Sequence, residues 1–408
     1  MFVPEPPDLA QLERITPSIY EASMNCLAKA AWSAFGDGSA LPQHLGAILG
    51  TAFHTVVAAA HKGELMVEGI GDRSPARELF DKTAQELHQV AHPLVKLKFR
   101  SAGRLPFYNL HRERSARIAT PVAASRHASS ASAVGAARSS ALSTRTESRL
   151  CSKDGRIVGR ADCIDGRSGM VIDYKTGHAS EVDADASAVS DSEVRQLRLY
   201  AYLAAENEIA VDKGVIVRGD GRRCEVAIAP AEAEAEADRA REQLFRLNAA
   251  AAEGDSFHDL TSPSPRNCSF CPCIPFCGPF WAAAKPEWTT VCGSNIEGDI
   301  VDVGSRDIQG SSLTTLILSR RAGTLSAERV SVEQIPSEWL RMNGWALPCV
   351  GDAVRVVHGR QVQMDENTAV VRVDKAMTAV WRVRRGNTDG GKKRVGEKHG
   401  GQPHTRTA

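Results

Sequence analysis

The chain has no long apolar run, and its first residues carry no recognisable export signal. None of its hydrophobic stretches approaches the roughly 20 consecutive apolar residues that a membrane-spanning helix needs. The opening residues, M-F-V-P-E-P-P-D, lack the basic and apolar regions of a secretory signal peptide. We therefore expect a cytoplasmic protein with no membrane partner.

A marked excess of charge of either sign is also missing. Lysine and arginine together number 50 against 49 aspartates and glutamates, so the net charge of +1 neither indicates nor excludes a nucleic-acid partner. A hydrophobic content of 42% with 24% charged residues is ordinary for a soluble globular protein, and 408 residues allow two or three domains. The ten cysteines favour metal or cluster ligation over disulfides in a cytosolic chain.

The most informative stretch lies near the middle of the chain and reads G-R-A-D-C-I-D-G-R-S-G-M-V-I-D-Y-K-T-G. Both halves alternate apolar and polar residues around the turn sequence G-R-S-G, which predicts a β-hairpin in which Asp165 pairs with Met170. This register places Asp162 opposite Asp173, and Lys175 falls on the same face as Asp173.

Two facing carboxylates repel each other unless a cation lies between them. Mg²⁺ is bound by oxygen ligands, often one or two protein carboxylates plus substrate phosphate, and a neighbouring lysine can stabilise charge on that phosphate. The alternative is a surface hairpin with solvated charges. The other face of the hairpin is predicted to join the core through Ile157, Ala161, Cys163, Ile172 and Tyr174.

Further motifs lie on either side of the hairpin. Upstream, L-G-A-I-L-G-T-A-F-H ends in His54, and downstream Q-L-R-L-Y-A-Y-L places Gln196 and Tyr200 one helical turn apart. Near residue 270, C-S-F-C-P-C-I-P-F-C contains a C-x2-C-x5-C pattern.

In this order, the motifs resemble those of the PD-(D/E)xK nuclease superfamily, specifically its RecB-like branch, over roughly residues 14–284. The resemblance implies an α/β fold with a restriction-endonuclease-like core, that is, a central mixed sheet flanked by helices. It also implies roles for individual residues. Mg²⁺ or Mn²⁺ would be bound by Asp162, Asp173, the backbone carbonyl of Tyr174 and His54. Lys175 would stabilise the attacking hydroxide or the phosphate, Gln196 would orient Lys175 or a phosphate, and Tyr200 would pack beneath them.

The iron–sulfur members of this branch have a four-cysteine clamp, and the resemblance extends to it. It implies a [4Fe–4S] cluster on Cys26, Cys268, Cys271 and Cys277. Four thiolates also suit tetrahedral zinc, and Cys273 could replace Cys26 in a wholly local zinc site. We interpret the remaining cysteines, Cys151, Cys163, Cys224, Cys292 and Cys349, as packing residues.

The chain divides into four predicted regions. Residues 1–13 are predicted to be loose, and 14–288 form the nuclease domain, with a helix beginning at Thr16 and Pro17 and ending near Phe35. An Ala/Ser/Arg-rich insertion at 114–146 is either disordered or a basic loop that contacts DNA phosphates. Residues 289–384 read as a small β-barrel, OB-like, and 385–408 as a basic disordered tail without a usable phosphate loop.

The function predicted from the resemblance is metal-dependent hydrolysis of phosphodiester bonds in DNA. The substrate would be single-stranded DNA ends attacked by an exonuclease, in DNA repair, recombination or defence, with any helicase supplied by another chain. A second hypothesis is a catalytically silent, iron–sulfur-stabilised DNA-binding subunit of a helicase–nuclease or defence complex. A third is a zinc-bearing interaction module.

Overall fold

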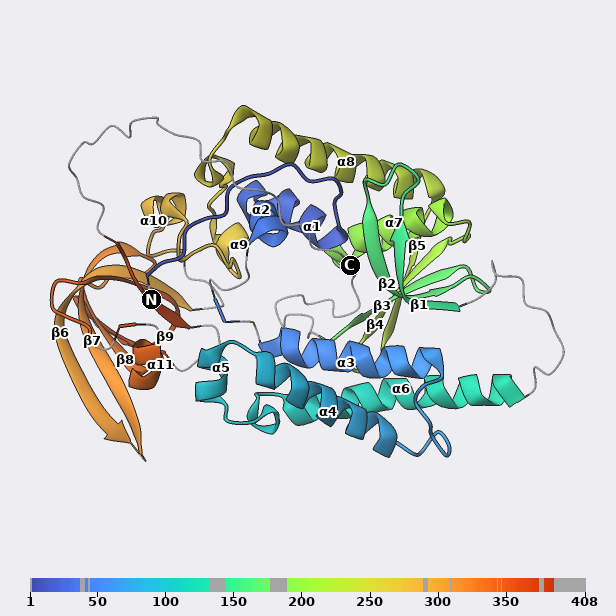
Figure 1. Ribbon diagram of the computed structural model, residues 1–408, viewed down its shortest axis with the longest axis horizontal. Helices are drawn as coiled ribbons and strands as arrows, with labels where there is room; N and C mark the ends of the chain where they lie inside the picture. Colours follow the sequence, from blue (N-terminus) through green and yellow to red (C-terminus); the bar gives the residue numbers. More distant parts are fainter. Residues whose placement is uncertain are drawn as a thin grey trace, which may run out of the picture.

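The computed structural model describes residues 2–36, 41–42, 45–131, 144–176, 189–288, 293–308, 310–342, 344–345, 347–373 and 378–384, with only the backbone at 129–131. Part of the predicted insertion at 114–146 and all of the predicted basic tail lie outside these ranges. Two β-sheets organise the described part of the chain, one among the helices and one at the end of the molecule (Figure 1).

The first sheet has the strand order β1-β2-β3-β4-β5. Its strands β3 and β4 are parallel and its other neighbours antiparallel, so the sheet is mixed. The strands are β1 (Thr144–Cys151), β2 (Val158–Asp165), β3 (Met170–Lys175), β4 (Lys213–Arg218) and β5 (Arg223–Ala227). The predicted hairpin and its register are confirmed, because β2 pairs with β3 and Asp165 with Met170.

Helices cover both faces of this sheet (Figure 1), which confirms the predicted α/β core with a central mixed sheet. One face carries α3 (Leu45–Lys62), α4 (Ser74–Val90) and α6 (Tyr108–Ala131). The other carries α1 (Pro17–Asn25), α7 (Asp191–Glu206) and α8 (Pro230–Glu253). The remaining helices are α2 (Leu27–Phe35), α5 (Pro93–Lys98), α9 (Pro265–Cys268), α10 (Gly278–Ala283) and α11 (Ser337–Met342).

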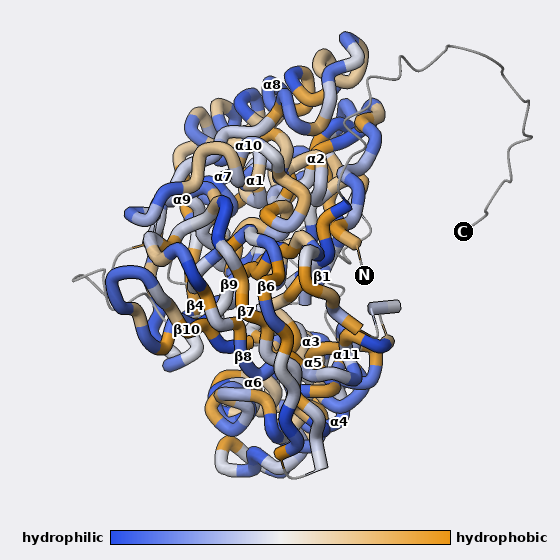
Figure 2. Tube along the Cα trace, turned by 90° about the vertical axis from the view of Figure 1, so that its left-hand side faces the viewer, coloured by the Kyte–Doolittle hydropathy of each residue, from blue (hydrophilic) through white to orange (hydrophobic). Residues whose placement is uncertain are grey.

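The outermost helix α8 is amphipathic, with one apolar face and one polar face. In Figure 2, α8 and α4 lie at opposite ends of the molecule, and α8 alternates between hydrophilic and hydrophobic colours. Its buried residues include Ala233, Ala237, Ala240 and Leu244, which face the sheet at helical spacing. Within the described ranges, no helix is both long and apolar enough to cross a bilayer.

The hydrophobic face of the hairpin differs from the prediction. Cys163, Ile172 and Tyr174 pack in the core under α3 and α6, but Ile157 and Ala161 belong to the core on the opposite face. The regular alternation of faces is interrupted in β2, where the strand is paired with β1 on both sides of residue 162 but not at it.

The single helix predicted between Pro17 and Phe35 is in fact two. Thr16 is the N-cap as expected, because its side chain accepts a hydrogen bond from the backbone of Ile19 at 3.2 Å. The helix then stops at Cys26, whose backbone is extended, and α2 begins at the next residue. The break places the half-buried Cys26 side chain between two helix ends.

The predicted disorder after Arg114 is wrong for the residues up to 131, which continue α6. Ala116, Ala119 and Ala123 are buried at helical spacing against the α3 side of the core. Small side chains allow two helices to pack closely, so a composition that looks unstructured is helical here. Pro121 lies within the helix on its exposed side.

The second sheet contains six strands in the order β10-β8-β7-β6-β9-β11, and β10 also pairs with β9. The pairing therefore closes a circuit of five strands, with β8 and β10 parallel and the other neighbours antiparallel. The strands are β6 (Ser294–Ile308), β7 (Ser311–Gly323), β8 (Arg329–Pro336), β9 (Ala353–Met364), β10 (Thr368–Arg372) and β11 (Ala379–Arg382). The short helix α11 lies between β8 and β9 in the chain.

The N-terminal residues, predicted to be loose, are held at two points. The backbone N–H of Val3 donates to the carbonyl of Arg382 at 2.9 Å, beside a bridge between Phe2 and that arginine. Leu12 exchanges two hydrogen bonds with the Asn248 side chain, at 2.7 and 2.9 Å. These backbone contacts hold the segment against β11 of the second sheet and against α8, which covers the first sheet. No side-chain pattern in the sequence predicts them.

Candidate active site

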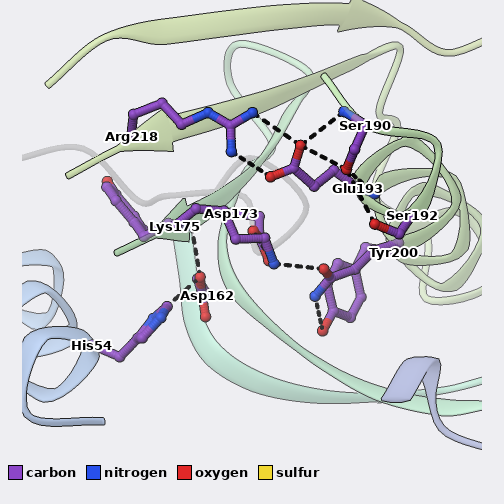
Figure 3. A network of polar contacts seen from close by, with 11 residues as sticks. His54, Asp162, Asp173, Lys175, Ser190, Ser192, Glu193, Tyr200 and Arg218 are labelled. Carbon is purple, nitrogen blue, oxygen red and sulfur yellow. Dashed lines mark hydrogen bonds and ion pairs between the residues drawn. The ribbon is translucent and has the colours of Figure 1, made fainter. Parts of the chain in front are cut away.

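The two hairpin carboxylates lie where β2 and β3 cease to form a regular ladder. The Asp162 carboxylate accepts a hydrogen bond from the backbone N–H of Tyr174 at 2.8 Å, which fixes it beside β3. Asp173 is buried, with 4% of its side chain exposed, whereas 17% of Asp162 is exposed. Figure 3 shows both residues between α3 and α7. The two carboxylates of the predicted pair therefore lie near each other, Asp173 in the protein interior and Asp162 closer to the surface.

His54 reaches this point from α3. Its Nδ1 atom lies 3.3 Å from a carboxylate oxygen of Asp162. Burial opposes protonation of the imidazole, but the hydrogen bond and the charge of Asp162 outweigh it and raise the pKa of His54. The helix places the histidine here because Phe53 and Val56 anchor its buried face.

Glu147, which the sequence did not indicate, completes with His54 and Asp162 a group of three side chains that could hold a metal ion. Their ligand atoms all lie within 4.8 Å of one another. Glu147 interrupts β1 with a φ of 51°, an uncommon conformation for a non-glycine residue. Its carboxylate pairs with Arg160 at 2.8 Å. Burial and the nearby charge of Asp162 raise the pKa of Glu147.

No sequence signal could have identified Glu147. It follows the Ala/Ser/Arg-rich segment, and its approach to the site depends on a left-handed backbone at a residue type that rarely adopts one. A strand beginning at Thr144 was not predicted.

Lys175 lies on the other side of the carboxylates and joins them to α7. Its Nζ atom is 2.8 Å from Asp173 and donates a hydrogen bond to the side-chain oxygen of Gln196 at 2.7 Å. The Gln196 amide nitrogen in turn donates to the hydroxyl of Tyr200 at 3.3 Å. Tyr200 packs in the core beneath, so the chain of contacts orients the lysine.

The N-terminus of α7 is fixed by a second network, visible in Figure 3. Ser190 caps the helix in a capping box with Glu193. The Glu193 carboxylate is also bound by both terminal nitrogens of Arg218 on β4. This anchorage of the helix to the sheet sets the position of Gln196 relative to β3.

The donor set fits a divalent cation. Carboxylate and carbonyl oxygens suit Mg²⁺ and Mn²⁺. Asp162 shares a group with Glu147 and His54, and the buried Asp173 lies close enough for the charge of Asp162 to act on it. Burial, assisted by the charge of Asp162, raises the pKa of Asp173 despite the opposing charge of Lys175. A cation would remove this penalty on the ionised form.

We expect the stabilisation by Mg²⁺ to depend on pH. The pKa of Asp173 is higher in the folded state than in the unfolded state, where an aspartate has a pKa of about 3.9. The metal-free protein therefore loses stability as the pH rises from the unfolded-state pKa through the folded-state pKa. Mg²⁺ binds only the ionised form, so its gain in Tm should be larger at about pH 7.5 than at about pH 5. Thermal unfolding with and without Mg²⁺ measures this. An equal gain at both pH values, or an undiminished gain in Asp173→Asn, would contradict the assignment.

The cysteines form a second cluster, far along the chain from the hairpin. Cys268, Cys271, Cys273 and Cys277 are buried together with the aromatic residues of α2 and α10, and Cys26 packs against the same group. The Cys26 sulfur accepts a hydrogen bond from the backbone N–H of Ser262 at 3.4 Å. Burial raises the pKa of Cys277 to about 12, and the neighbouring thiols, including Cys26, add to this. The residues predicted as ligands are therefore neighbours, and so is Cys273.

Comparisons with known proteins bear on the first of these two sites. No curated protein matches the chain. A solved structure entitled "Crystal structure of SSO0001" shares 21% sequence identity over 49% of this chain and 95% of that one, with a TM-score of 0.23. The family model of the PD-(D/E)XK nuclease superfamily matches residues 14–278, which include every side chain of the candidate active site. Since the match spans more than half of the sequence, the chain belongs to the PD-(D/E)XK nuclease superfamily.

Proposed function

We propose that this protein is a metal-dependent deoxyribonuclease that hydrolyses phosphodiester bonds with Mg²⁺ or Mn²⁺. The observation that carries the proposal is the group of His54, Glu147 and Asp162, whose ligand atoms lie within 4.8 Å of one another, beside the buried Asp173 and its 2.8 Å ion pair with Lys175. A surface hairpin with solvated charges would not bury Asp173 beside a lysine.

The side chains divide the chemistry between them. Asp162, Asp173, His54, Glu147 and the backbone carbonyl of Tyr174 would hold the cation. When bound, the cation would neutralise charge on the scissile phosphate and make water a stronger nucleophile. Lys175 presents its ammonium group to the phosphate or to the attacking water, and Gln196 keeps it in that direction through the 2.7 Å hydrogen bond. Tyr200 supports Gln196 from the core.

We also propose that Cys26, Cys268, Cys271 and Cys277 hold a [4Fe–4S] cluster, with zinc as the alternative. Support comes from the burial of Cys268, Cys271 and Cys277 in one group, against which Cys26 packs. Four thiolates can hold either a [4Fe–4S] cluster or zinc. Such a cluster would join α2 to the end of the matched region as a structural clamp.

The second sheet supports a proposal about the substrate. We propose that this closed five-stranded circuit, with a helix between its third and fourth strands, is an OB-like barrel, a fold that often binds single-stranded nucleic acid. We therefore propose an exonuclease acting on single-stranded DNA ends, in the RecB-like branch of the superfamily. Repair, recombination or defence in the cytoplasm, with a helicase in another chain, is the corresponding biological setting.

Lys175→Ala tests the proposed chemistry. Because the lysine acts on charge that develops during the reaction, we expect kcat to fall by roughly 10²–10³, as when one electrostatic donor is lost. Metal affinity should be unchanged or slightly higher, since a neighbouring positive charge is removed. Single-turnover cleavage of labelled DNA and metal titration provide the two readouts. A change in KM alone would instead make the lysine a ground-state phosphate contact.

A further inference from the structure

A cavity of about 490 Å³ opens beside the active site, between the α1–α2 segment and the start of α7. We call it the α1–α7 cavity. Its lining includes Ser18, Asn25, Lys29, Lys175, Ser192 and Gln196. Its volume is in the range of roughly 300–1,000 Å³ that small-ligand sites occupy. Because Lys175 and Gln196 belong to its wall, whatever it binds must lie next to the scissile phosphate.

The charges in this cavity are paired, with one exception. Arg195 is held by Glu21 through two hydrogen bonds, at 2.9 and 3.0 Å. Glu193 is bound by Arg218, and Lys175 lies against Asp173. Lys29 is partly buried, and none of the described residues forms an ion pair with its ammonium group. A partly buried ammonium without a counter-ion is unfavourable, so the site favours an anionic ligand.

The opposite side of the metal ligands has a cavity of its own. It measures about 310 Å³ and is lined by Thr51, His54, Thr55, Lys62 and Glu147, among others. The candidate active site thus lies between two polar cavities, each with a lysine. A single strand crossing the metal ligands would pass from one cavity into the other, and would place a flanking phosphate in each.

We propose that the α1–α7 cavity binds the phosphate adjacent to the scissile one, with Lys29 as its charged contact. The inference rests on the proposed function, because it takes the ligand to be a DNA strand held for cleavage. Ser18, Asn25 and Ser192 add uncharged hydrogen-bonding groups that suit phosphate or sugar oxygens. Lys29 is a binding residue that positions the strand, and it takes no part in the chemical step.

Lys29 also lies beside the cysteine group. Its backbone N–H donates to the carbonyl of Cys26 at 3.0 Å, and its charge acts on the thiols of Cys268 and Cys271. A purely structural role, as a counter-ion of the cysteine group, is therefore the rival explanation. The two roles differ in what they predict for DNA binding.

The test is the salt dependence of DNA binding by Lys29→Gln in the full-length protein. The probe is a labelled oligonucleotide of about twenty thymidines, in EDTA to prevent cleavage. Each phosphate neutralised on a single strand contributes about −0.7 to the slope of log K against log salt concentration. We expect the slope of Lys29→Gln to be less steep by about 0.7, with about tenfold weaker binding at low salt. Lys29→Arg should retain the wild-type slope.

Lys82→Gln is the matched control, because it removes the same charge from an exposed position on α4 and should behave as wild type. An unchanged slope in Lys29→Gln, with or without a change in the visible spectrum of the cysteine group, would overturn the inference. If the wild-type protein neither bound nor cleaved DNA, the proposed function itself would fail. If the wild-type protein bound and cleaved DNA while Lys29→Gln matched it, only the assignment of the cavity would be wrong.

Discussion

Asp162→Asn is expected to lower the cleavage rate by at least about 10³, because several kcal/mol of charge stabilisation by the metal are lost. Asp162 contacts several other parts of the site. Its carboxylate lies 3.3 Å from His54 and within 4.8 Å of a Glu147 oxygen, and it accepts a hydrogen bond from the backbone N–H of Tyr174. Asparagine keeps the shape and an oxygen for that backbone hydrogen bond. The fold and DNA binding should therefore survive, and cleavage and metal titration on the same preparation measure the loss.

Glu147→Gln serves as the graded comparison for Asp162→Asn. The Glu147 carboxylate shares its charge with Arg160 at 2.8 Å, so its loss should cost roughly 10- to 100-fold in metal affinity, less than the loss of Asp162. Cleavage above a tenth of the wild-type rate in Asp162→Asn would refute the assignment of the central ligand. An unchanged metal affinity in Glu147→Gln would remove Glu147 from the donor set.

The second large effect is expected from Cys26→Ser. Cys26 lies at the break between α1 and α2, and the segment after it packs on the cysteine-rich end of the matched region, with Trp32 and Phe276 rings 4.8 Å apart. If Cys26 is a ligand of the proposed cluster, its loss should abolish visible absorption and lower the free energy of unfolding by about 4 kcal/mol or more, the range reached when a metal site is removed. Absorption spectra, iron and zinc analysis and denaturant unfolding provide the measurements.

Cys273→Ser separates the two candidate metal groups. Cys273 is buried beside Cys271 but is surplus to a set that includes Cys26. A [4Fe–4S] cluster on the four predicted ligands leaves Cys273→Ser coloured and stable. A local zinc site reverses the pattern: Cys26 becomes dispensable, Cys273 essential, and the protein colourless throughout.

Local chemistry made the hairpin and the start of α1 predictable. The turn sequence between Asp165 and Met170 fixes the register, and the Thr16–Pro17 pair marks the beginning of α1. The Gln196 and Tyr200 side chains then meet Lys175 because a helix brings positions four residues apart to one face.

The remaining features depend on tertiary contacts that no local pattern encodes. The helix break at Cys26 occurs among residues that favour a continuous helix. The alanine face of α6 looks unstructured until a partner helix packs on it. Glu147 enters the site through a left-handed backbone that its residue type disfavours.

The most direct measurement of the central claim is cleavage of end-labelled single-stranded and duplex DNA by the wild-type protein, with Mg²⁺, with Mn²⁺ and with EDTA. We predict metal-dependent release of labelled products that EDTA abolishes and that Asp162→Asn and Lys175→Ala do not generate at a comparable rate. DNA binding without cleavage under every metal condition would contradict the account and favour a silent DNA-binding subunit.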